Sequence, residues 1–158
     1  MTELPRKVMT LVLVRQGSRV LLGLKKVRMG AGRWNGFGGK VEAGEAIESA
    51  AIREAREEAG IEVGTLQKVG IAEFHSPVRA FVVEMHIFET REFTGEPQES
   101  DEMRPQWFEL DALPKDEMWK SDLQWWPEYL KGNKFTARFV FDKDDNVLEH
   151  EIHQVGSF

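Results

Sequence analysis

The sequence contains no cysteine. Disulfides, thiolate zinc sites and cysteine nucleophiles are therefore excluded. It also lacks an apolar run long enough for a membrane span or for the hydrophobic part of a signal peptide. A chain without cysteine suits a reducing compartment, and we expect a cytoplasmic protein that has no membrane partner.

An excess of positive charge is also missing, since 21 Lys and Arg residues oppose 27 Asp and Glu residues. Proteins that coat nucleic acid usually carry a basic stripe, so we expect no stable nucleic-acid partner. A local basic cluster of Lys25, Lys26 and Arg28 is still suited to hold one small anion. The chain has neither the HExxH spacing of a zinc protease nor a P-loop or Rossmann fingerprint, which disfavours kinase and dehydrogenase functions.

The 158 residues predict one domain over residues 1–158, and we expect a monomer. Apolar and β-branched patterns predict strands over 8–14, 19–24, 70–74, 80–90, 106–110, 134–141 and 147–155. Helices are predicted over 46–59 and 124–131, each followed by glycine within two residues. The glycine-rich stretch 25–39 reads as a long functional loop, and 91–103 as an acidic loop. The fold class is α+β with a mixed sheet.

Three carboxylates fall on one face of the predicted first helix, because Glu54, Glu57 and Glu58 stand at positions i, i+3 and i+4. Like charges at this spacing weaken an isolated helix, which indicates that a cation lies between them. Mg²⁺ prefers oxygen ligands, and Mn²⁺ accepts the same donors. The pattern therefore predicts a divalent metal site.

The stretch 39–61 reads GKVEAGEAIESAAIREAREEAGI and resembles the Nudix box. Seven fixed positions match, namely Gly39, Glu45, Arg53, Glu54, Glu57, Glu58 and Gly60. One position departs, because Ala55 stands where the family prefers a larger aliphatic residue. Members of the Nudix family hydrolyse nucleoside diphosphates linked to another moiety. The resemblance implies an α/β/α sandwich around a mixed sheet.

The resemblance to this family also implies roles for single residues. The metal ligands would be the backbone carbonyl of Gly38 and the carboxylates of Glu54, Glu57, Glu58 and Glu102. Glu102 would be either a ligand or the general base. Arg53 would hold a box carboxylate through a bidentate pair, and Glu45 would brace the loop that precedes the helix.

Further stretches resemble one branch of the family, the animal-type oxidised purine nucleoside triphosphatases. They are GAGRWNGFGGK at 30–40, SDEMRP at 100–105, Trp119, and WWP at 125–127. That branch releases pyrophosphate and the monophosphate from 8-oxo-dGTP and 2-hydroxy-dATP, which cleanses the nucleotide pool. The resemblance implies the same reaction here and assigns the substrate contacts to Thr10, Lys25, Asn35, Phe74, Met103, Trp119 and Asp122.

Two departures from this branch concern the base pocket. Ser121 precedes Asp122 where the branch has two adjacent aspartates, and Met29 replaces an aromatic residue found in some relatives. Serine and aspartate offer different hydrogen-bond donors, so we expect a changed preference among damaged purines. Two alternatives remain: a Nudix hydrolase of another nucleoside diphosphate derivative, because the box contacts only phosphates and metal, and a nucleotide-binding module without turnover.

Overall fold

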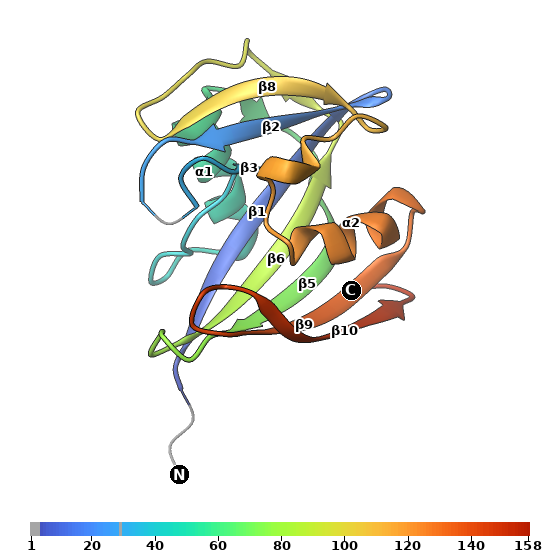
Figure 1. Ribbon diagram of the computed structural model, residues 1–158. Coiled ribbons are helices and arrows are strands. Elements are labelled where there is room, and N and C mark those ends of the chain that lie inside the picture. Colours follow the sequence, from blue (N-terminus) through green and yellow to red (C-terminus); the bar gives the residue numbers. More distant parts are fainter. Residues whose placement is uncertain (1–3, 29) are drawn as a thin grey trace.

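A mixed eight-stranded sheet forms the middle of the computed structural model, which describes residues 4–28 and 30–158 (Figure 1). Its strands are β1 (Arg6–Gln16), β2 (Arg19–Lys25), β3 (Trp34–Asn35), β5 (Gln67–His75), β6 (Val82–Thr90), β8 (Met103–Glu109), β9 (Lys134–Phe141) and β10 (Val147–Val155). Their order is β10-β9-β5-β6-β1-β2-β3, and β8 pairs with β2. The β1/β6 and β5/β9 pairs are parallel. Two short strands, β4 (Glu62–Val63) and β7 (Phe93–Thr94), form a separate small sheet.

The two α-helices cover opposite faces of this sheet (Figure 1). Helix α1 (Ile47–Ala59) buries an alanine stripe against Val12, Phe37 and Phe88. Helix α2 (Asp122–Leu130) buries aromatic side chains, Trp125 among them, on the other face together with Phe135 and Phe139 of β9. The predicted α/β/α arrangement and the α+β class are confirmed. No helix in the described part of the chain is long and apolar enough to cross a membrane.

The predicted elements are present, but several boundaries differ: β5 begins at Gln67 and not at 70, and β8 begins at Met103, inside the predicted acidic loop, and not at 106. Helix α1 begins one residue after the predicted start, with Ala46 as its N-cap, and ends at Gly60 with φ of 69°. Helix α2 spans Asp122–Leu130, whereas 124–131 was expected. Strands β3 and β7 lie inside the two predicted loops, and a 3₁₀ turn, η1 (Lys115–Glu117), precedes α2. A two-residue strand carries no periodicity from which a pattern could be recognised.

A gap between β1 and β2 shapes the centre of the molecule. The two strands pair only near their connecting turn, where Val14 lies opposite Leu21. Farther along, the segment 36–41 takes the place of β2: Thr10 N donates to Gly39 O at 2.9 Å and Val12 N donates to Phe37 O at 2.6 Å. A Cβ atom at Gly38 would overlap the carbonyl oxygen of Thr10. Only glycine therefore permits this close approach of the two backbones.

Candidate active site

Arg53 donates hydrogen bonds to three carboxylates, those of Glu45, Glu54 and Glu57. Its guanidinium donates to both carboxylate oxygens of Glu45, at 2.8 and 3.0 Å, and this bidentate pair joins the helix to the loop before it. The same guanidinium donates to Glu54 at 3.0 Å and to Glu57 at 3.2 Å. The hydrogen bonds from Arg53 hold the pKa of Glu45 at about 2, so this carboxylate stays charged.

Glu58 is the most deeply buried carboxylate of the helix, with 3% of the residue exposed. It accepts a hydrogen bond from the backbone N–H of Gly38 at 2.8 Å. Burial raises its pKa to about 8 against the lowering effect of this bond, and the nearby charges of Glu54 and Glu102 raise it further. The positive charge of Lys25 lowers the pKa of Glu58, as the hydrogen bond from Gly38 does.

Glu54 and Glu102 complete the acidic group around Glu58. Burial raises the pKa of Glu54, and the charges of Glu57 and Glu102 act in the same direction against Arg53. The carboxylate of Glu54 fills the space beside Gly39, where a Cβ atom would lie 2.5 Å from an oxygen of Glu54. Glu102 is held at the rim by Arg28, whose guanidinium lies 3.4 Å from it. The charges of Glu57 and Glu102 thus act on Glu54, and those of Glu54 and Glu102 act on Glu58.

This donor set fits a hard divalent cation. Burial and neighbouring carboxylates raise the pKa of Glu54 and of Glu58, and the positive charge of a bound cation would oppose this rise. Over residues 4–28 and 30–158, no three acidic or histidine side chains already stand close enough together to hold a metal. The carboxylates around Glu58 offer oxygen donors, which suit Mg²⁺ and Mn²⁺ and not a thiolate-seeking metal.

A cavity of about 110 Å³ opens next to Glu58. Seven of the predicted site residues line it: Thr10, Lys25, Asn35, Gly38, Glu58, Met103 and Trp119. Met103 is buried in a space that Gly23 leaves open. A Cβ atom at Gly23 would lie 2.6 Å from the end of the Met103 side chain. One cavity therefore contains both a box carboxylate and the residues expected to hold a base.

Two of the predicted substrate contacts, Phe74 and Asp122, do not line the cavity. Phe74 stacks on Phe139 at 5.5 Å between ring centroids. Asp122 is buried at the start of α2, where its Oδ1 accepts a hydrogen bond from the indole N–H of Trp125 at 3.1 Å, and its Oδ2 has no hydrogen-bond partner. Burial raises the pKa of Asp122 to about 7. Met29 lies outside the described residues.

The sequence did not indicate several residues that line the cavity. They are Met9, Leu11, Gly30, Arg33, Gly36 and Met85. Met9 and Met85 meet because β1 and β6 are parallel and in register at these positions. Arg33 stands within the glycine-rich stretch, and its charge among neutral neighbours was the one available signal.

A family model described as the NUDIX domain matches residues 4–129. The chain belongs to the Nudix family. The oxidized purine nucleoside triphosphate hydrolase of Danio rerio is 49% identical over 149 residues, covering 94% of this chain and 96% of that protein. The protein of the same description from Mus musculus is 48% identical over 152 residues, covering 96% of this chain and 97% of that protein.

Solved structures agree with this assignment. The MutT protein of Bacillus halodurans superposes with a TM-score of 0.82 at 26% sequence identity, covering 92% of this chain and 97% of that chain. Nudix hydrolases in general use a divalent metal, in keeping with the oxygen donors around Glu58. The similarity extends well beyond the box, over nearly the whole length of this Nudix chain.

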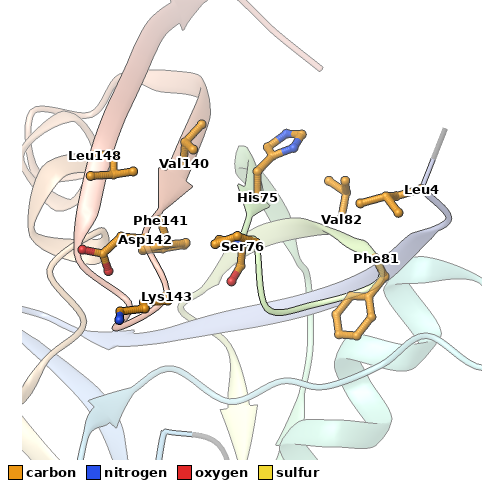
Figure 2. A pocket seen from close by; sticks show the side chains of 11 residues that line it. Leu4, His75, Ser76, Phe81, Val82, Val140, Phe141, Asp142, Lys143 and Leu148 are labelled. Atoms are coloured by element: carbon orange, nitrogen blue, oxygen red, sulfur yellow. The ribbon is translucent and has the colours of Figure 1, made fainter. Parts of the chain in front are cut away.

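A second hollow, of about 440 Å³, lies away from the Nudix box, between the turn after β5 and the turn joining β9 to β10 (Figure 2). Its walls are mostly apolar, and Leu148 and Phe81 are among the side chains that line it. Of its polar groups, Asp142 accepts hydrogen bonds from the backbone of its own turn and His75 pairs with Glu73 at 2.9 Å, while Lys143 also lines the hollow. Among the described residues that line this hollow there is no carboxylate of the Nudix box, whereas Glu58 lines the smaller cavity, and the smaller cavity is the candidate site.

Proposed function

We propose that this Nudix chain hydrolyses oxidised purine nucleoside triphosphates, of the 8-oxo-dGTP and 2-hydroxy-dATP type, to the monophosphate and pyrophosphate with Mg²⁺. One observation carries the proposal: Glu58 of the box lines the same cavity as Asn35 and Trp119. The identity of nearly half of the residues to proteins described as oxidized purine nucleoside triphosphate hydrolases supports the substrate class. Removal of such nucleotides would keep the precursor pool clean.

At the phosphate end, the proposed ligands of Mg²⁺ are Glu54, Glu57, Glu58, Glu102 and the carbonyl of Gly38. A bound Mg²⁺ would neutralise charge on the phosphate oxygens and help to activate a water, and Mn²⁺ could replace it. Arg53 orients Glu54 and Glu57 from one side, and the Gly38 N–H orients Glu58. For Glu102 the alternative role is that of the general base, because its side chain is 39% exposed and can exchange protons with solvent.

At the base end, two polar groups that line the cavity are available to a purine. The Oδ1 of Asn35 accepts a hydrogen bond from the N–H of Gly36 at 2.9 Å, which leaves its NH₂ group to donate to a ligand. The hydroxyl of Thr10 is buried without a hydrogen-bond partner. Oδ2 of Asp122 also lacks a partner, but Asp122 does not line the cavity. Buried polar atoms without partners are costly, so a ligand that satisfies them binds more tightly. Trp119 supplies a flat wall for stacking.

The test is pyrophosphate release from a panel of normal and oxidised nucleoside triphosphates, with and without Mg²⁺. We expect metal-dependent release with a clear preference for an oxidised purine. Equal kcat/KM for normal and oxidised purine nucleoside triphosphates would contradict the sanitising role, although the chain would still hydrolyse triphosphates. No release from any triphosphate would contradict the proposed reaction altogether.

A further inference from the structure

Arg33 is a cavity residue outside the Nudix box. It ends the turn after β2, where its carbonyl oxygen accepts a hydrogen bond from Lys25 N at 3.0 Å and its own N–H donates to Gly30 O at 3.0 Å. Gly32 N donates to Lys25 O at 2.8 Å, so two backbone hydrogen bonds join this turn to the end of the strand. The backbone of Arg33 is therefore firmly placed at the mouth of the cavity.

The guanidinium of Arg33 lies over the indole ring of Trp119, with Cζ 4.0 Å from the ring centroid. This is the shortest cation–π contact in the described part of the chain. Within the same residues, Arg33 forms no ion pair with a carboxylate. Its guanidinium therefore contacts the ring of Trp119 and not a carboxylate. Arginine suits such a contact better than lysine, because a planar guanidinium can stack flat on an aromatic ring.

Trp119 lines the cavity, and its indole also packs near Gly30, where an added Cβ atom would lie 3.5 Å from the ring. Its backbone oxygen accepts a hydrogen bond from Asp122 N at 3.0 Å, which ties the main chain to the start of α2. No other aromatic ring among the described residues stacks on it. Arg33 is therefore the one planar side chain that stacks on this ring within the described residues.

We propose that Arg33 is a positioning residue that holds Trp119 in place as the stacking wall for the purine base. The inference rests on the proposed function, in which a purine nucleotide occupies the cavity. Without the guanidinium, the indole would sample several rotamers and lose that freedom on binding, which weakens affinity. Arg33 acts on the base end through Trp119 and contributes little to the phosphate end.

The experiment measures the dissociation constants of 8-oxo-dGMP and of pyrophosphate for the full chain by calorimetry. Arg33→Ala should weaken binding of 8-oxo-dGMP about 3- to 10-fold and raise KM with little change in kcat, while pyrophosphate binding stays the same. Arg33→Lys should retain part of the affinity. In a Trp119→Ala background, Arg33→Ala should add almost nothing, because the residue through which it acts is gone.

Arg19→Ala is the matched control, since Arg19 lies 4.9 Å from the ring centroid of Trp107, away from the cavity. It should leave both dissociation constants unchanged. The proposal is overturned if Arg33→Ala weakens pyrophosphate as strongly as 8-oxo-dGMP, if its effect persists at full size without Trp119, or if it tightens nucleotide binding. Coupling between Arg33 and Trp119 in 8-oxo-dGMP binding, without hydrolysis of any triphosphate, would support this inference while contradicting the proposed function. No binding of 8-oxo-dGMP by the native chain would overturn the inference as well.

Discussion

At the scale of single residues, Asp122 is a carboxyl group placed almost entirely out of water. Only 3% of the residue is exposed, and burial raises its pKa to about 7. The folded chain therefore binds this proton more tightly than the unfolded chain between about pH 4 and pH 7. The corresponding stability is present in full at low pH and falls as the pH rises through that window.

The first prediction follows from this difference in proton binding. Between pH 5 and pH 8 the unfolding free energy of the native protein should fall, and that of Asp122→Asn should fall less, because the amide carries no charge to bury. The difference between the two falls should be on the order of 1–4 kcal/mol. Denaturant unfolding of both proteins at the two pH values measures it. Asp116→Asn, at an exposed position, is the control. An equal pH dependence in native protein and Asp122→Asn would contradict the prediction.

Ser121 is also buried, with 2% of the residue exposed, and it stands where the related branch carries a second aspartate. Ser121→Asp should change the ranking of damaged purines while hydrolysis continues, because a second carboxyl next to Asp122 changes the available donors and acceptors. The measurement is kcat/KM over a panel of oxidised purine triphosphates. Ser49→Asp, on the exposed side of α1, controls for the added charge. An unchanged ranking in Ser121→Asp would show that this position does not select the base.

At the scale of elements, the segment 36–41 depends on its contact with β1. Gly38→Ala should push this segment away from Thr10, costing more than about 2 kcal/mol of unfolding free energy and lowering kcat/KM, because Glu58 loses its aligned N–H donor. Thermal or denaturant unfolding and steady-state kinetics measure the two effects. Gly156→Ala, where no atom lies within 4 Å of the added methyl, should change neither. Native-like stability of Gly38→Ala would mean that the close backbone approach is not required.

Elements with local signals were predictable from the sequence, and the cavity was predictable only in part. Helix α1 has an alanine stripe and a terminal glycine, so its limits were predicted to within one residue. The box carboxylates lie on that helix and could be placed together. Met9 and Met85 share the cavity only because two distant strands pair in parallel, and no local pattern shows that register. The stacking of Arg33 on Trp119 likewise depends on how two loops approach each other.

At the scale of the whole molecule, the two apolar cores are complete without the metal. Each lies on one face of the sheet, and neither includes a box carboxylate. Mg²⁺ should therefore add stability to a fold that already exists, rather than create the fold. This expectation separates the chain from proteins that unfold when their metal is removed.

The corresponding prediction is that Mg²⁺ at about 100 times its dissociation constant raises the melting temperature by several degrees. A chelator should stop turnover and return the temperature to its metal-free value without unfolding the chain. Glu58→Gln should fold normally, lose turnover on the order of 10²-fold, and show a smaller metal-induced shift, because a neutral amide replaces a metal-binding charge. Calorimetry with parallel kinetics measures all three. Full activity of folded Glu58→Gln would contradict the assigned ligand role.

The cavity of such an enzyme is lined from both layers of the fold. Helix α1 supplies Glu58 from one face of the sheet, and Met103 packs in the same core as this helix, whereas Met85 packs against the core on the face that α2 covers. A substitution at Met85 can therefore reshape the cavity wall without altering the packing of the helix that carries the box carboxylates. The same architecture can acquire a new nucleotide preference in this way while the box is inherited intact.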